Sequence, residues 1–386
     1  MKPISILIAG DIFPMKYPEL FSEGRTDRLF SKEITDLFQQ ADFSVCNLEG
    51  TLTNASARRP KCGPCLKADP ATIRAVKNLG IDLVSLANNH ITDYGAQGLE
   101  DTIACLEKEE IAHFGAGKNA SQINPCVKRR FGDRTVCFYS VAETVFNIPD
   151  ENREGANLYD EYRVCSELKQ IKAECDLLIV LYHGGVEYFQ FPTPWLRTRF
   201  HRMADCGADI VVAQHTHCIG TREMYNGSYL LYGQGNFHFD QRSHPEITRA
   251  GLLLELVLQD DSFEMKHHLI HREEEKAVYD DPQDLSAFEE RNRRLENGET
   301  FDPEFSAYCG EWTGKWLIEF RGNRYVEKVL NKVLPDGRYL RFLRRKYDNH
   351  TVLRMLEHVR GEEDAEVMQR GLQDFYLMKK QTGKRP

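Results

Sequence analysis

Five apolar runs of the sequence end in polar side chains of the kinds that bind divalent metals. The carboxylates, amides and imidazoles at these ends are Asp11, Asn47, Glu49, Asn88, Asn89, His90, His183, His215 and His217. No thiolate belongs to the set, and such oxygen and nitrogen ligands suit Mn²⁺, Fe²⁺ or Zn²⁺. The residue types therefore predict a site for one or two divalent ions.

The joint placement of these residues is more informative than any one of them. A lone histidine after a strand is commonly structural, Asp11 suits a cap on the next segment, and Asn88 with Asn89 suits a turn. In open α/β sheets, however, ligands bind beyond the carboxyl ends of the strands. We therefore expect the five strand ends to converge on one crevice.

His215 and His217 carry a further expectation, because they lie two residues apart. In an extended strand end, side chains with this spacing point to one side of the sheet and can serve one site or two adjacent ions. The two carboxylate oxygens of Glu49 suit it to bridge a pair of ions.

The elements that must position these residues alternate between short apolar runs and amphipathic stretches, which is typical of βα units around a largely parallel sheet. Strands are predicted at Ile4–Ala9, Phe43–Asn47, Leu83–Ala87, Val136–Val141, Leu177–Tyr182 and Ile210–Ala213. Helices are predicted at Asp27–Gln40, Pro70–Leu79 after an Asp69 cap, Ala96–Glu109, Tyr159–Glu174 and Pro194–Cys206.

The pattern changes after about Cys218. Asn226-Gly227 between two strand-like runs is a strong hairpin signal, and Gly251–Leu258 with Met265–Ile270 predicts a second antiparallel pair. Charged sequence with helical periodicity follows. We therefore predict a boundary near Pro282 between a domain of residues 1–281, which carries all the candidate ligands, and a helical extension of residues 282–386.

Composition limits the classes of function. A formal net charge of −9 argues against a general nucleic-acid binder, which needs a basic face. The apolar run from Ile4 to Ala9 is too short for a membrane span and shows no cleavage pattern. The 11 cysteines are an odd number and are scattered through apolar runs, as expected of reduced thiols. These features favour a cytoplasmic protein without a membrane span.

The CxxC of Cys62 and Cys65 raises a separate possibility, a thiol-disulfide enzyme. A redox CxxC requires its first cysteine at a helix N-terminus directly after a strand, where the thiol pKa is lowered. Here the motif follows the loop "TNASARRP" and precedes "LKADP", whose Asp69 caps the next helix. We interpret both cysteines as loop thiols.

Eight collinear blocks resemble the CapA or poly-γ-glutamate synthesis family of capsule biosynthesis proteins, within the calcineurin-like metallophosphatase superfamily. The blocks include "NLEGTLT", "LGIDLVSLANNHITDYGAQGLEDT", "HGGVEYFQFPTP", "AQHTH" and "YGQGNFHFD", and together they cover about residues 3–260. The resemblance implies a four-layer α/β/β/α fold with its site at one end of the sandwich.

The resemblance also implies roles for individual residues. The metal ligands would be Asp11, Glu49, Asn89, His183, His215 and His217, with His90 as the catalytic histidine and with Asn47 and Asp93 in support. A metal-activated water would attack phosphorus while His90 assists. An anionic polymer or phosphoester would be the substrate, and proteins of capsule synthesis would be possible partners. Arg58, Arg59 and Lys67 are candidates for an anion-facing rim, although a solvated loop explains them as well.

One departure from the superfamily keeps two functions open. The position two residues after the first aspartate, usually histidine, is Phe13, so one metal position loses a ligand. The retained His90 favours a metal-dependent hydrolase. Phe13 favours a non-catalytic subunit that supports synthesis or export of an anionic polymer.

Overall fold

The computed structural model describes residues 3–61, 63–144, 153–240, 244–259, 262–279 and 285–319, together with 361, 365–368, 370–372 and 374. The chain divides into two compact units. The first comprises Met1–Arg59 and Cys65–Glu299, and the second comprises Pro60–Pro64 and Thr300–Pro386. The first unit contains both large β-sheets and all the candidate metal ligands.

The larger sheet of the first unit has eight strands in the order β18-β17-β16-β1-β2-β5-β6, and β15 also pairs with β1. Its parallel core, β1, β2, β5 and β6, is extended by the antiparallel strands β16, β17 and β18. The strands are β1 (Ile4–Ile12), β2 (Phe43–Leu48), β5 (Leu83–Ser85), β6 (Ala112–Phe114), β15 (Asn236–His238), β16 (Ala250–Gln259), β17 (Ser262–Glu273) and β18 (Lys276–Tyr279).

The smaller sheet has six strands in the order β13-β14-β12-β11-β9-β8. These are β8 (Cys126–Phe131), β9 (Arg134–Ala142), β11 (Leu177–His183), β12 (Ile210–Gln214), β13 (Arg222–Tyr225) and β14 (Ser228–Leu231). Two short pairs lie apart from the large sheets: β3 (Thr51–Leu52) with β4 (Lys67–Ala68), and β7 (Ala116–Gly117) with β10 (Gly155–Ala156).

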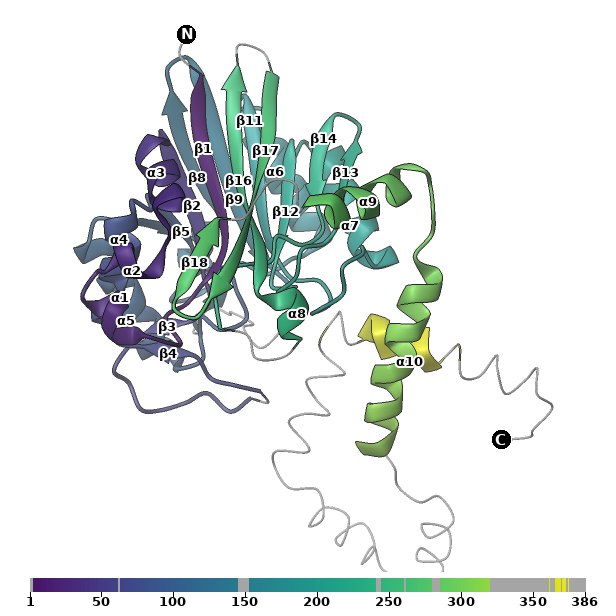
Figure 1. Cartoon of the computed structure of the whole chain (residues 1–386), viewed down its shortest axis with the longest axis horizontal. Helices are drawn as coiled ribbons and strands as arrows, with labels where there is room; N and C mark the ends of the chain where they lie inside the picture. The colour runs from purple at the N-terminus through teal and green to yellow at the C-terminus, as the bar shows by residue number, and fades with distance from the viewer. Residues whose placement is uncertain are drawn as a thin grey trace, which may run out of the picture. The chain divides into compact units, whose positions relative to one another are not determined.

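Alternation along β1 shows how the layers pack. Ile6 and Ile8 join a buried core with Phe138, Ile179 and Val212 of the six-stranded sheet, so this core lies between the two sheets. The intervening residues of β1 pack instead into a second core with residues of α1–α5. Those helices are α1 (Pro18–Ser22), α2 (Thr26–Leu29), α3 (Lys32–Gln40), α4 (Ile73–Leu79) and α5 (Gly95–Lys108), and α1–α4 gather beside β2 and β5 in Figure 1.

The outer face of the six-stranded sheet is covered by α6 (Glu161–Lys172) and α7 (Pro194–Asp205). Phe200 of α7 packs edge-on against Tyr182 of β11, with ring centroids 5.3 Å apart. Burying such aromatic and aliphatic side chains stabilises the fold by about 1.5–3 kcal/mol each. The layers therefore run helix, sheet, sheet, helix, and the predicted α/β/β/α sandwich is confirmed.

The predicted elements of this unit are present with shifted ends. All six predicted strands occur, as β1, β2, β5, β9, β11 and β12. The helix predicted at Asp27–Gln40 is instead two helices, because Phe30 is extended and bridges to Ala277. Ser31 then caps α3 by accepting a hydrogen bond from the backbone N–H of Ile34.

Local turn and cap chemistry explains several other boundaries. Asp69 accepts from the backbone N–H of Ala71 and starts the 3₁₀ turn η1 (Pro70–Thr72) that leads into α4. Asn226 and Gly227 have φ angles of 49° and 86° and join β13 to β14, as the hairpin signal predicted. The antiparallel pair predicted for residues 251–270 is confirmed as β16 and β17. The remaining short elements are η2 (Ala120–Gln122), α8 (Pro245–Thr248) and α9 (Ser286–Glu296).

The second unit contains α10 (Asp302–Glu319) and helical residues between 365 and 374. Arg370 pairs with Asp302 at 3.3 Å and with Asp374 at 3.1 Å. Helix α9 belongs to the first unit, and the boundary predicted near Pro282 remains a prediction. No helix within the described ranges combines the length and apolarity needed to cross a membrane.

Candidate metal centre

Asp11 connects the two sheets at the edge where their strands end. Its fully buried carboxylate accepts a hydrogen bond from Asn47 Nδ2 at 2.7 Å through Oδ1. Through Oδ2 it accepts from the backbone N–H of His215 at 3.0 Å. Asp11 and Asn47 belong to the eight-stranded sheet, whereas His215 follows β12 of the other sheet. The predicted strand ends therefore converge on one place.

The Glu49 carboxylate, fully buried just after β2, lies among the imidazoles. Its Oε1 is 3.7 Å from Nε2 of His183, 3.9 Å from Nε2 of His217 and 4.0 Å from Nε2 of His90. Glu49, His215 and His217 can offer ligand atoms that all lie within 4.8 Å of one another. Two atoms that each lie about 2.1 Å from one ion are about 3–4 Å apart, and the separations of Glu49 from His183 and from His217 fall in this range.

His183, the last residue of β11, is held between two amides. Its Nε2 lies 3.1 Å from Oδ1 of Asn89, and its Nδ1 lies 3.2 Å from Nδ2 of Asn47. Burial, followed by the neighbouring site histidines, lowers the pKa of His183 well below its ordinary value. A neutral imidazole is the form that binds metal, and an ion shared with Asn89 would replace the hydrogen bond between them.

His215 and His217 do not form the extended strand end predicted for them. Their φ angles are 91° and 53°, which place both in the left-handed region just beyond β12. Non-glycine residues adopt this conformation rarely, and such strain concentrates at functional sites. The rings still face the same cluster, with centroids 5.9 Å apart and with His183 5.0 Å from His215.

Asn236 of β15 orients His217 and was not among the predicted site residues. Its Nδ2 donates to the carbonyl of Thr248 at 2.9 Å, so its Oδ1 faces Nδ1 of His217, also at 2.9 Å. Nδ1 of His217 must then carry the proton, and Nε2 is left as the metal-binding nitrogen on the side of Glu49. The sequence contained Asn236 as a polar residue of "GQGNF". Its pairing with Asp11 in the sheet is visible only in the fold.

Replacing Asn236 with alanine is expected to weaken Mn²⁺ binding about 10- to 100-fold, because His217 would lose its fixed tautomer and ring orientation. Calorimetric titration of the metal-free protein measures this affinity. Asn236→Asp keeps an acceptor for His217 and serves as the matched control. Equal affinities for the alanine variant and the unaltered protein would contradict the orienting role.

His90 and Asp93 form a pair beside the cluster. Nδ1 of His90 lies 2.7 Å from Oδ2 of Asp93, which also accepts from the backbone N–H of Leu66 at 2.7 Å. The backbone N–H of His90 donates to Oδ1 of Asn88, whose Nδ2 donates to the Leu48 carbonyl. These bonds leave Nε2 of His90 on the side of Glu49, 4.0 Å from its Oε1.

Phe13 occupies the position where the resemblance described above implies a further histidine ligand. It is 1% exposed, and a Cβ atom added to Gly50 would lie 2.4 Å from its ring, so the ring packs directly on the backbone next to Glu49. An apolar ring donates no ligand there.

The predicted rim residues are engaged in local contacts. Arg59 Nη1 donates to Thr92 Oγ1 at 2.7 Å, and its backbone N–H donates to the Asp93 carbonyl at 2.8 Å. Lys67 donates to the Ala55 carbonyl at 2.7 Å and lies 5.0 Å above the Tyr94 ring, whereas Arg58 is exposed. Arg59 and Leu66 therefore lie beside Asp93, and a role of the predicted rim in binding anions remains a proposal.

The CxxC motif lies in this same loop. Cys62 falls outside the described residues. Cys65 lies between β3 and β4, with its Sγ 3.9 Å from the Arg59 carbonyl, and no helix begins at it. Its surroundings agree with the interpretation as a loop thiol.

Glu187, which the sequence analysis did not single out, lies at the edge of the cluster. Its Oε1 is 4.0 Å from Nε2 of His215, and 36% of its side chain is exposed. Burial opposes ionisation of this carboxyl, but the nearby His215 and His217 imidazoles outweigh it and hold its pKa below the ordinary value. Glu187 thus adds negative charge where the cluster opens to solvent.

A buried ionic network supports the turn after His183. Arg199 of α7 is 3.3 Å from Glu143 Oε1, to which the Tyr182 hydroxyl donates at 2.6 Å. A Cβ atom on Gly184 would lie 2.4 Å from the Glu143 side chain, and the backbone N–H of Glu143 donates to the His183 carbonyl. The network thus fixes the backbone that carries a candidate ligand.

Arg199→Met is expected to lower the free energy of unfolding by about 3–5 kcal/mol, because it leaves Glu143 buried without its cation. Urea unfolding monitored by circular dichroism measures the loss. Arg202→Met on the same helix removes only a surface pair with Glu161 and should cost less than about 1 kcal/mol. Similar losses in the two variants would contradict this role.

Stacked mixed sheets between helices, with carboxylate, amide and imidazole groups at one edge, define a metallophosphatase-like fold with a possible metal site. Residues 5–241 match the family described as bacterial capsule synthesis protein PGA_cap. The chain belongs to this family, which comprises the CapA and poly-γ-glutamate synthesis proteins.

Relatives in two Bacillus species and in Mycobacterium tuberculosis agree with this assignment. The chain is 27% identical over 246 residues to the PGA biosynthesis protein CapA of Bacillus subtilis, covering 62% of this chain and 64% of that protein. It is 27% identical over 248 residues to the capsule biosynthesis protein CapA of Bacillus anthracis, covering 62% and 60%. A probable polyglutamine synthesis accessory protein of Mycobacterium tuberculosis is 29% identical over 208 residues, covering 50% and 55%. The chain thus spans less than two thirds of each of these relatives.

Solved structures with a similar arrangement include a putative 5′-nucleotidase from Staphylococcus aureus in complex with alpha-ketoglutarate. It has a TM-score of 0.47 and 17% identity, and the match covers 77% of this chain and 58% of that one. A hypothetical protein from Thermus thermophilus has a TM-score of 0.46 and 16% identity, covering 70% of this chain and 100% of that one.

Proposed function

We propose that this chain is a metal-dependent hydrolase of the phosphoesterase type that acts in the metabolism of an anionic capsule polymer such as poly-γ-glutamate. The observation that carries the proposal is the arrangement of three imidazole Nε2 atoms at 3.7–4.0 Å from one oxygen of buried Glu49. Such a set has the chemistry of a metal site, and the family context supplies the polymer.

In the proposed mechanism some residues of the cluster bind metal and others act on the substrate. Six residues would hold one or two ions of Mn²⁺, Fe²⁺ or Zn²⁺: Asp11, Glu49, Asn89, His183, His215 and His217. A bound ion would supply a nucleophilic water at neutral pH and neutralise charge on the scissile group. Asn47 keeps Asp11 and His183 in register, since it lies within hydrogen-bond distance of both.

His90 would act as the proton donor to the leaving oxygen or stabilise charge in the transition state. Asp93 accepts from Nδ1 of His90 and so would fix the ring with Nε2 toward the reacting groups. The His183 pKa is held low by burial, which keeps that ring neutral and available as a ligand across the physiological range.

The test begins with elemental analysis of the purified protein and continues with hydrolysis of phosphomonoester and phosphodiester substrates in added Mn²⁺. His183→Ala is expected to lose both metal and hydrolysis. Absence of metal from the unaltered protein, or hydrolysis that survives this substitution, would rule the proposal out.

Phe13 supports a second candidate function, a non-catalytic subunit that assists synthesis or export of the polymer. The buried ring takes a position where a second ion would need a ligand. This candidate predicts that the protein binds one equivalent of metal and hydrolyses none of the phosphoester substrates.

A further inference from the structure

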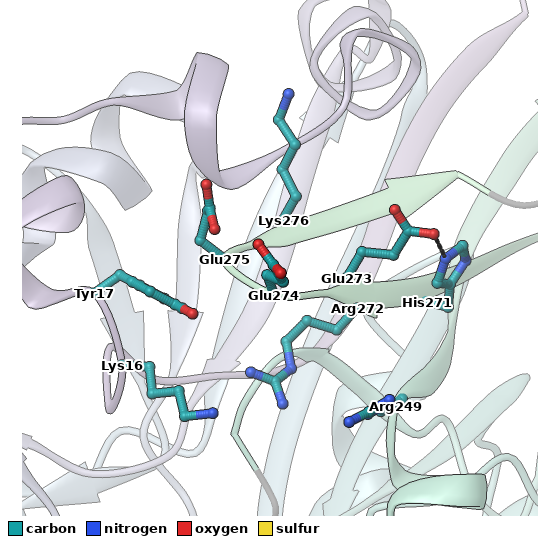
Figure 2. Close-up of a pocket in the computed structure, with 9 residues that line it drawn as sticks. All are labelled: Lys16, Tyr17, Arg249, His271, Arg272, Glu273, Glu274, Glu275 and Lys276. Atoms are coloured by element: carbon teal, nitrogen blue, oxygen red, sulfur yellow. Dashed lines mark hydrogen bonds and ion pairs between the residues drawn. The ribbon is translucent and has the colours of Figure 1, made fainter.

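A polar pocket of about 790 Å³ lies in the first unit, and Figure 2 shows its lining. Lys16, Tyr17, Arg249 and Arg272 contribute side chains to it. In Figure 2 the ammonium group of Lys16 and the guanidinium groups of Arg249 and Arg272 lie toward one side, and the carboxylates of Glu274 and Glu275 lie toward the other. The pocket therefore has a distinct cationic side.

The strand directions place this pocket at the same edge of the sheet as the metal centre. β16 is antiparallel to β1, and β17 is antiparallel to β16, so β17 runs in the direction of β1. Arg272, near the end of β17, therefore lies at the edge where Asp11 lies near the end of β1. Arg249 directly follows Thr248, whose carbonyl receives the hydrogen bond that fixes Asn236.

The charges on the cationic side are only partly balanced. Buried Asp240 pairs with Lys16 at 3.1 Å and with Arg272, which holds these two cations together. One carboxylate thus faces two cations. The exposed Arg249 guanidinium makes no hydrogen bond or ion pair with any other residue that the structure describes, and it adds a third cation to this side.

Two of the carboxylates that line the pocket interact with basic groups other than Lys16, Arg249 and Arg272. Glu275 pairs with Arg28 at 2.7 Å, and Glu273 accepts from His271 at 2.8 Å. Because of these pairs, Glu273 and Glu275 do not neutralise the charges of Lys16, Arg249 and Arg272. A net positive field therefore remains on the side of the pocket nearest Thr248.

We propose that this pocket binds a carboxylate group of an anionic polymer and so positions the chain next to the metal centre. The inference rests on the proposed function and names the substrate-binding surface of that same site. Guanidinium and ammonium groups bind carboxylates through charge-assisted hydrogen bonds, and the Tyr17 hydroxyl is a further donor. Among the described residues no carboxylate competes for Arg249, so affinity depends most on this cation.

The test measures fluorescence anisotropy of a labelled, γ-linked oligoglutamate in EDTA, where neither metal binding nor hydrolysis contributes. Arg249→Glu is expected to weaken binding by more than about tenfold and Arg249→Gln by about tenfold, whereas Lys16→Met, which removes a cation already paired with Asp240, should weaken it less. Lys276→Ala removes a cation from the same pocket whose ammonium group points away in Figure 2, and it should leave affinity unchanged.

Any of the following results would overturn the proposal: no binding by the unaltered protein, binding by the Arg249 variants equal to that of the unaltered protein, or a loss in Lys276→Ala equal to that in the Arg249 variants. Equal affinity for a neutral oligoglutamine would also overturn it. Because the assay contains no metal, failure of the hydrolase proposal would leave these outcomes unaffected. The glutamine variant keeps the test decisive if charge reversal prevents folding.

Discussion

Replacing Glu49 with alanine is expected to remove divalent metal from the purified protein and to weaken Mn²⁺ binding at least about 100-fold. One oxygen of this buried carboxylate lies 3.7 Å from Nε2 of His183 and 3.9 Å from Nε2 of His217, so Glu49 borders two of the candidate ligands directly. Changes to residues that merely orient ligands cost about 10- to 100-fold, and loss of a direct ligand should cost more.

Two measurements make the Glu49 result specific. Elemental analysis gives the metal content, and the rise in melting temperature on addition of Mn²⁺ reports binding without any assay of activity. Glu49→Gln preserves side-chain volume and removes only the charge, so it separates loss of a ligand from damage to packing. Metal content equal to that of the unaltered protein in both variants would refute the assignment of Glu49 as a ligand.

Replacing His90 with asparagine is expected to lower kcat by about 10²- to 10⁴-fold while metal content and KM stay close to those of the unaltered protein. This pattern follows from geometry. Nδ1 of His90 is engaged by Asp93 at 2.7 Å, and Nε2 is 4.0 Å from Glu49, so the ring borders the ligands and can reach a substrate.

Asp93→Asn provides the matched comparison for His90. The amide can still accept from the Leu66 backbone, so the loop should remain in place, but the ring would lose its anionic partner. A smaller fall in kcat than for His90→Asn is expected. If His90→Asn instead lost its metal, His90 would be a ligand and not the proton donor.

The sequence was sufficient for the layered fold because local signals and tertiary packing agree there. The alternation Ile6, Leu7, Ile8 in β1 requires an apolar partner on each face, and only a strand between two packed layers meets that requirement. Polar residues end four of the strands, β1, β2, β11 and β12, and this pattern predicted that these ends meet at one edge. The structure brings Asp11, Glu49 and the histidines together there.

Other parts of the site depended on information that no local pattern contains. The left-handed backbone of His215 and His217 breaks the two-residue periodicity on which their predicted orientation rested. Asn236 joins the site because β15 inserts beside β1, and Arg249 and Arg272 reach the pocket through β16 and β17. Such contacts between distant segments decide which cations and amides face a site.

The pairing of Asp11 with Asn236 also has a consequence for how the protein is made. The two residues are neighbours in the sheet although 225 positions separate them, as their numbers show. A nascent chain that has not yet emerged beyond β15 carries Glu49 and His183 but lacks the residue that fixes His217. Because contacts of such long sequence separation form late, the complete centre should appear only in the last stages of folding. Synthesis of β15, more than early collapse, would then set the earliest moment at which the complete centre can form.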